Sequence, residues 1–172
     1  MANFDKITST KVQKGTIILH KGDTCNFGYK VVSGCLKSYV IDKSGKEHIV
    51  QFAPEDWFIS DMDSFFNNKP SNIFIDAIED TEFLKIGKPS FEDLAKHDSN
   101  ALKEQNVKMR KSLISLNRRL IGLLSSTAEE RYFEFLQTYP NMVQRLPLKL
   151  IASYIGITPE YLSEIRRKIA KK

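Results

Sequence analysis

One change of hydrophobic period, near Pro89, constrains the fold of this 172-residue chain more than any other feature. Before Pro89, short runs of β-branched and aromatic residues alternate with turn signals, such as those at 33–34 and 43–46. The predicted strands cover residues 16–19, 29–32, 36–41, 48–52, 73–78 and 82–86. Because no long helical pattern separates them, they predict an antiparallel sandwich or jelly roll and not a parallel sheet. Beyond Pro89 the pattern is helical, with a short helix expected at 90–96, so the predicted class is α+β.

A long helix is predicted from residue 99 to residue 125, where the sequence has no proline. Residues of this helix that follow one another at alternating intervals of four and three positions form a heptad seam: Leu102, Asn106, Met109, Leu113, Leu116, Leu120 and Leu123. A single asparagine at such a seam can fix the register of a two-stranded pairing. A second apolar stripe consists of Val107, Ile114 and Ile121. We interpret the seam as a dimer interface; the alternative is that both stripes are buried within one monomer.

A helix-turn-helix is predicted at 148–168. Ala152 supplies the small residue at the helix crossing, and Gly156 supplies the positive φ that the turn needs. Thr158 is expected to cap the second helix and Pro159 to open it. The residues expected to bury the two helices against each other are Ile151, Ile155, Ile157, Leu162 and Ile165. The alternative is a helical hairpin that does not bind DNA.

A preceding helix is expected to begin at a capping box formed by Thr127 and Glu130 and to end before Pro140. The predicted domains are therefore a sensor roll at 1–98, a dimerisation helix at 99–125 and a helix-turn-helix domain at 126–172.

The formal net charge of +5 lies entirely within residues 145–172, which suggests contact with a polyanion there. The second helix of the motif would enter the major groove. The predicted DNA-binding residues are Thr158, Pro159, Glu160, Ser163, Glu164, Arg166, Arg167, Lys168 and Lys171. Glu160 could accept a hydrogen bond from a cytosine amino group, whereas the four basic residues are expected on phosphate. The Glu164 carboxylate needs a hydrogen-bond donor on a base or must turn away from the DNA. Three other residues of this helix are expected to face the core: Tyr161, Leu162 and Ile165.

Three stretches together resemble the Crp/Fnr family of transcription regulators: KGTIILHKGD at 14–23, the segment 31–58, and the segment 128–168. The last is similar to the short-tailed members of Bacteroidetes. The resemblance covers nearly the whole chain. It implies a cyclic-nucleotide-binding-like β-roll, a dimerisation helix and a winged helix-turn-helix. The wing is expected to be missing here, and the Lys-rich end could make up for it.

The resemblance also implies an effector pocket in the roll, at Phe58, Ser60, Asp61, Ser71 and Asn72. Family members that bind cyclic nucleotides carry a Gly-Glu pair and then an arginine followed by a small hydroxyl residue. This chain has no arginine between residues 1 and 109, so a cyclic nucleotide is not expected and no cofactor is predicted. Cys25 and Cys35 do not match the cysteine set of the iron–sulfur members, and the three scattered histidines do not suggest haem.

Other functional classes find little support. No HxH or HExxH spacing occurs, so neither a metal site nor an enzyme is predicted. The sequence has no run of 18 apolar residues and no signal-peptide-like start, so we expect a cytoplasmic protein that does not contact a membrane.

The predicted function is that of a homodimeric, sequence-specific regulator of transcription, gated by a small-molecule effector in the roll. Double-stranded DNA is the predicted partner, and RNA polymerase is a further candidate. Three alternatives stay open: a cupin-like enzyme, a small-molecule-binding roll whose helical tail contacts a protein, and a constitutive regulator without a ligand.

Overall fold

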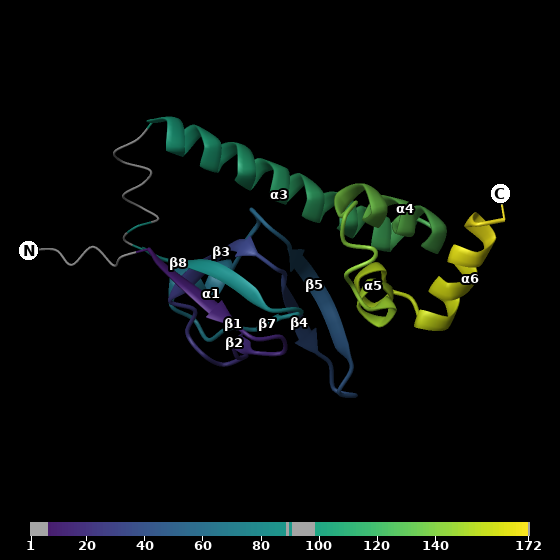
Figure 1. The fold of residues 1–172 in the computed structure, drawn as a ribbon, viewed down its shortest axis with the longest axis horizontal. Helices are drawn as coiled ribbons and strands as arrows, with labels where there is room; N and C mark the ends of the chain where they lie inside the picture. The colour runs from purple at the N-terminus through teal and green to yellow at the C-terminus, as the bar shows by residue number, and fades with distance from the viewer. Residues whose placement is uncertain (1–6, 89, 91–98, 172) are drawn as a thin grey trace, which may run out of the picture. The chain divides into compact units, whose positions relative to one another are not determined.

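The computed structural model describes residues 7–88, 90 and 99–171, with the side chains of 99–102, 104 and 105 outside this description. The chain forms two compact units, Met1–Leu102 and Lys103–Lys172. Each unit is described by itself below (Figure 1). The short helix expected at 90–96 lies, apart from Ser90, outside the described residues.

The first unit is a roll of two four-stranded antiparallel sheets with one short helix. One sheet has the strand order β1-β8-β3-β6 and the other has the order β2-β7-β4-β5. Its elements are β1 (Thr8–Val12), β2 (Ile17–Leu19), β3 (Phe27–Ser33), β4 (Leu36–Ile41), β5 (Glu47–Ala53), β6 (Phe58–Ile59), α1 (Met62–Asn67), β7 (Phe74–Ala77) and β8 (Thr81–Gly87). The predicted antiparallel roll is thereby confirmed.

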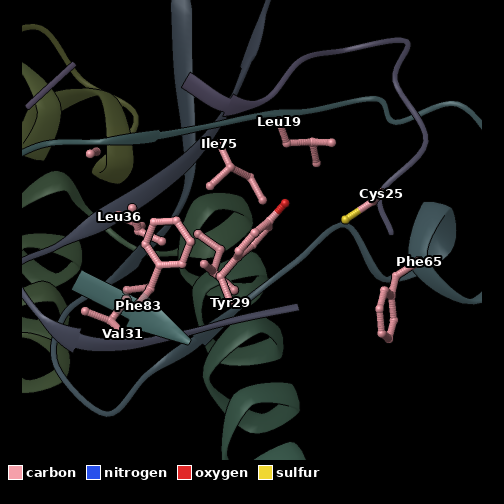
Figure 2. Close-up of a cluster of buried hydrophobic side chains, with 11 residues drawn as sticks. Leu19, Cys25, Tyr29, Val31, Leu36, Phe65, Ile75 and Phe83 are labelled. Atoms are coloured by element: carbon pink, nitrogen blue, oxygen red, sulfur yellow. The ribbon is translucent and has the colours of Figure 1, made fainter. Parts of the chain in front are cut away.

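The core of the roll consists largely of side chains that point inward from every second residue of the strands (Figure 2). Tyr29 and Val31 of β3 are buried with Phe83 of β8, and the rings of Tyr29 and Phe83 meet edge to face at 5.4 Å. Leu36 and Ile75 join them from the other sheet. Large apolar side chains from both sheets therefore fill the interior, and each contributes about 1.5–3 kcal/mol on burial.

Three elements of the roll were not predicted: β1, β6 and α1. The strand β1 has the sequence Thr-Ser-Thr-Lys-Val and lies, mostly exposed, at the edge of its sheet. Its residues therefore lack the alternation of polar and apolar side chains that would predict a strand. It pairs with β8 along its whole length, from Thr8 opposite Lys85 to Val12 opposite Thr81. The strand β6 has two residues and α1 has six, so neither repeats a pattern long enough to predict it.

The second unit contains α3 (Ser99–Ser125) from Lys103 onward, and also α4 (Ala128–Thr138), α5 (Leu148–Ile155) and α6 (Pro159–Ile169). The long predicted helix forms as α3 with the predicted bounds. The capping box is also present, since Thr127 Oγ1 accepts from the Glu130 amide and the Glu130 carboxylate accepts from the Thr127 amide at 2.8 Å. The hydrogen bonds that the Glu130 carboxylate accepts from the Thr127 amide and hydroxyl lower the pKa of Glu130. None of the helices in the described ranges combines the length and the apolar character needed to cross a bilayer.

Candidate nucleic-acid interface

The helices α5 and α6 meet at a sharp turn centred on Gly156. This residue has φ 74° and ψ 39°, and its amide donates to the carbonyls of Ala152 and Ser153. The Ile157 amide donates to the Ala152 carbonyl at 3.0 Å, which completes the cap. The positive φ favours glycine at this position, and a Cβ there would lie 3.1 Å from Leu123 Cδ2, so the Leu123 side chain would have to shift by a few tenths of an ångström.

The crossing of α5 and α6 is closely packed. Ala152 is fully buried and lets the second helix approach the first. The apolar residues around it are also buried: Ile151, Ile155, Leu162 and Ile165. Ile157 is only partly buried. The predicted packing of the helix-turn-helix is thus present, and it fixes which side of α6 remains open.

The first turn of α6 is capped as expected. The Thr158 hydroxyl accepts from the Tyr161 amide at 3.3 Å, and Pro159 opens the helix. The Ser163 hydroxyl donates to the Pro159 carbonyl at 3.0 Å. Glu160 in this turn is favourably placed near the positive end of the helix dipole, and Arg166, Arg167 and Lys168 near its negative end.

The open side of α6 carries both charge signs. With 100° between residues, the side opposite the buried Leu162 and Ile165 presents five exposed side chains: Glu160, Ser163, Glu164, Arg167 and Lys171. We call these five residues the outward face of α6. Across residues 103–171, no ion pair within 4 Å joins Glu160 or Glu164 to a basic side chain, so both carboxylates are available to a partner. Arg166 and Lys168 are exposed at the two margins of this face.

The expectation that Tyr161 faces the core is wrong, because its side chain is 46% exposed. The buried stripe of α6 runs through Leu162, Ile165 and the partly buried Ile169. Tyr161 precedes Leu162 by one residue, a rotation of about 100° that moves it to the margin of the stripe. An aromatic side chain therefore borders the outward face.

The heptad seam of α3 is exposed in the single chain. Met109, Leu113, Leu116, Leu120 and Leu123 are between 43% and 68% exposed, and Asn106 is exposed as well. The side chain of Leu102 lies outside the described residues. Val107, Ile114 and Ile121 of the second stripe are also exposed. Contiguous exposed apolar side chains of this kind are typical of interaction surfaces.

The residues expected to hold an effector lie around the first turn of α1. The Asp61 carboxylate caps α1 by accepting from the Ser64 amide at 3.1 Å, and it also accepts from Ser71 Oγ at 2.8 Å and the Asn72 amide at 3.1 Å. Ser60 Oγ donates to the Phe27 carbonyl at 3.3 Å. The structure therefore brings Asp61, Ser71 and Asn72 together.

Phe58 makes a different contact. Its ring lies against Gly28, where a Cβ would approach the ring to 2.0 Å. The Phe58 carbonyl accepts from Gln51 Nε2 at 3.0 Å. Phe58 is thus held on β6 by packing and does not share the hydrogen bonds of Asp61.

The sequence model of the cyclic nucleotide-binding domain matches residues 9–98, more than half of the chain. Regulatory protein HlyX of Actinobacillus pleuropneumoniae is 30% identical over 189 residues, covering 99% of this chain and 76% of that protein. The chain belongs to the Crp/Fnr family of transcription regulators. Its similarity to HlyX includes both the roll and the helix-turn-helix.

Solved structures of Crp/Fnr proteins share the fold. FixK2 from Bradyrhizobium japonicum superposes with a TM-score of 0.78 at 21% identity, covering 96% of this chain and 85% of that one. A transcriptional regulator of the CRP/FNR family from Thermus thermophilus gives a TM-score of 0.75 at 15% identity, covering 95% and 86%. The roll followed by a helical domain is therefore the family architecture.

The Crp/Fnr roll raises the question of a cyclic nucleotide, and the residues around Asp61 do not fit one. A phosphate needs free donors and a cation. Here the Ser64 amide, the Ser71 hydroxyl and the Asn72 amide already donate to the Asp61 carboxylate. The nearby Lys69 pairs with Asp63 at 3.3 Å. A phosphate at this position would meet a carboxylate in place of donors.

Cys25 and Cys35 are buried thiols that do not form a disulfide. Cys25 Sγ lies 3.2 Å from the Phe27 carbonyl oxygen and 3.4 Å from Ser60 Oγ. Within the described ranges, no three His, Cys, Asp or Glu side chains come together in a way that could hold a metal ion.

Proposed function

We propose that this Crp/Fnr protein regulates transcription as a homodimer that binds a two-fold symmetric site in double-stranded DNA. The observation that carries the proposal is the outward face of α6, where five polar or charged side chains are exposed opposite a fully packed helix crossing. Family membership supports the same function.

In this proposal the N-terminal half of α6 reads bases in the major groove. Glu160 and Glu164 stand one turn apart, about 6 Å along the helix axis, which is close to the rise of two base pairs. Each carboxylate can accept from the N4 amino group of a cytosine. Thr158, Pro159 and Ser163 border these two positions. The Ser163 hydroxyl, which donates to the Pro159 carbonyl, can accept from a base donor. This assignment gives Glu164 a role in base recognition.

The basic side chains would bind the DNA backbone. Arg166, Arg167, Lys168 and Lys171 are all exposed in or just beyond the last turns of α6. Cations at this position can neutralise phosphates without reading sequence. Tyr161, at the margin of the outward face, is available for contact with a sugar or a thymine methyl group.

The heptad seam of α3 supports the dimer. Two copies of the seam would bury the exposed leucines of both chains, with Asn106 facing its counterpart. The two α6 helices would then meet DNA about one helical turn apart. A palindromic site follows from this symmetry.

The roll would receive an effector near Asp61, at the residues Phe58, Ser60, Asp61, Ser71 and Asn72. Because a carboxylate occupies the centre of this group, the effector would be a small cation or a hydrogen-bond donor. A thermal-shift panel of amines and nucleotides tests this, since a bound ligand raises the melting temperature. A rise with amines alone supports the proposal, and a rise with cyclic nucleotides alone contradicts it.

Selection of DNA sites from random duplexes tests the main proposal. The purified full chain should enrich a palindrome whose half-sites are centred about 10–10.5 base pairs apart. A single unrepeated half-site would contradict the dimer, and the absence of any enriched site would contradict sequence-specific binding.

A further inference from the structure

The last turn of α5, just before Gly156, is held by two arginines that come from other helices. A helix leaves its last four carbonyls without backbone partners, and in α5 these belong to residues 152–155. The carbonyls of Ala152 and Ser153 are taken by amides of the turn itself. The carbonyls of Tyr154 and Ile155 accept instead from Arg119 and Arg131.

Arg119 reaches the turn from α3. Its Nη2 and Nε atoms donate to the Tyr154 carbonyl at 2.8 Å and 3.2 Å. Its guanidinium carbon also lies 4.0 Å from the centre of the Tyr154 ring. Arg119 is partly buried at this contact, and burial lowers its pKa.

Arg131 joins the ends of two helices. From α4, its Nε donates to the Ile155 carbonyl at 2.7 Å, and its Nη1 donates to the Ser126 carbonyl at 2.5 Å. Ser126 directly follows α3, so one guanidinium compensates the negative C-terminal ends of both α3 and α5.

A partly open groove lies beside these bonds, and both arginines line it. A cavity of about 320 Å³ is lined by residues of α3, α4 and α5, including Ser115, Gly122, Thr138 and Ile155. Close contact between α3 and the turn is made at Leu123, which faces Gly156. The arginine bonds therefore add fixed polar connections between α3, α4 and the last turn of α5.

We propose that Arg119 and Arg131 are positioning residues that make the C-terminal half of α3 and the helix-turn-helix one rigid body. The inference rests on the proposed DNA-binding function. In a dimer paired along α3, the direction of α3 would then set the position at which each α6 meets the groove. A regulatory change would have to move α3 itself, because the helix-turn-helix does not swing about the 126–127 junction.

The test compares R119Q with R118Q in the full chain. Both variants remove one positive charge at adjacent positions, but Arg118 is exposed and pairs only loosely with Glu134, at 3.4 Å. Affinity is measured for the selected palindrome and for an unrelated duplex at one salt concentration. R119Q should weaken binding to the palindrome by about tenfold or more, while R118Q changes it less than about threefold.

Three further readouts separate positioning from other roles. Binding of R119Q to the unrelated duplex, and the slope of its affinity against salt, should match R118Q, because no phosphate contact is lost. R119K keeps the charge but loses the paired donors, so its affinity should lie between those of R119Q and the wild type. If R119Q does not fold, R119K and R131K are compared with R118Q in its place.

The inference is overturned if R119Q, folded at the assay temperature, binds the palindrome as R118Q does. Failure of the proposed function would look different, because the wild type would then enrich no duplex. In that case the rigid junction is tested by hydrogen exchange at the Gly156 and Ile157 amides. Faster exchange in R119Q than in R118Q supports the rigid junction, and equal exchange overturns it.

Discussion

The Lys37 ammonium nitrogen lies 3.2 Å from Asp76 Oδ2, and both side chains are buried where β4 pairs with β7. Lys37 also pairs with Glu47 at 3.0 Å and lies 3.8 Å from the centre of the Tyr39 ring. Asp76 Oδ1 has no hydrogen-bond partner within the described ranges. Burial raises the pKa of Asp76, and Lys37 offsets part of that rise.

Replacing Lys37 with Met should destabilise the protein by about 3–5 kcal/mol near neutral pH, because it leaves the Asp76 charge buried without its partner. A carboxyl whose folded pKa is raised favours the fold most below its unfolded pKa, and this stability is lost as pH rises through the folded pKa. Losing Lys37 raises the pKa of Asp76 further. The destabilisation, measured by urea unfolding, should therefore be larger at pH 8 than at pH 5.

The matched control for this variant is K30M. Lys30 pairs with the exposed Asp56 at 3.5 Å, so its loss should cost less than about 1 kcal/mol at either pH. If K37M lowered the free energy of unfolding equally at both pH values, the result would contradict a buried charge on Asp76.

Asp42 organises the hairpin between β4 and β5. Its carboxylate accepts from Ser44 Oγ at 2.6 Å and from the Lys46 amide at 3.1 Å, and it lies 2.6 Å from His48 Nε2. These partners hold the pKa of Asp42 well below its usual range, first through Ser44 and then through His48. The stabilisation is therefore present above the unfolded pKa and is lost as pH falls toward the folded one.

The variant D42N should consequently lower the urea midpoint at pH 7 and have a smaller effect at pH 3, where the unfolded carboxyl is mostly protonated but the folded one keeps its charge. D23N removes an exposed carboxylate from a different turn and serves as the control, with little change expected at either pH. A D42N effect that persists undiminished at pH 3 would count against the charge of Asp42 as its source.

Glu164 is the most informative residue for base recognition. A Gln at this position can bond adenine at N6 and N7, whereas a carboxylate accepts from the N4 group of cytosine. Selection with E164Q should shift one position of the half-site from cytosine toward adenine, a discrimination of about 1–3 kcal/mol. The same experiment with E160Q should shift a different position, about two base pairs away. If E164Q selects the wild-type site, Glu164 does not read a base.

The seam of α3 can be tested at Leu113, which is 68% exposed in the single chain and so contributes little to its own fold. Placing a charge there with L113E should turn the dimer into a monomer in sedimentation equilibrium, because two like charges would face each other across the seam. K111E, on the opposite side of the same helix, should leave the dimer intact. Dissociation by both variants would indicate a general charge effect and no specific seam.

The elements that the sequence predicted are those whose signals are local and repeated. The helix α3 has a heptad period over its whole length, and the turn at Gly156 combines a positive φ with a following cap at Thr158. The exposed, polar strand β1 has no such signal, because its place in the sheet depends on β8, which is distant in the sequence. The margin position of Tyr161 depends on the exact direction of the buried stripe, because an error of one residue rotates a side chain by about 100°.

The arginine bonds at the end of α5 were also beyond sequence reasoning. Arg119 is 35 residues from Tyr154, and Arg131 is 24 residues from Ile155. Within its own helix each arginine resembles an ordinary exposed cation. The only sequence signal is that α5 ends without a basic residue in its last turn, so its terminal carbonyls need donors from elsewhere.

The central claim, that the basic and polar surface of α6 binds DNA, is tested most directly by affinity for the selected duplex across a salt series. The wild type should lose affinity linearly on logarithmic axes as salt rises, and K168Q should reduce the slope by about 1. K46Q, which removes an exposed charge from the β4–β5 hairpin, should leave the slope unchanged. An affinity that does not depend on salt, or equal slopes for K168Q and the wild type, would contradict the account.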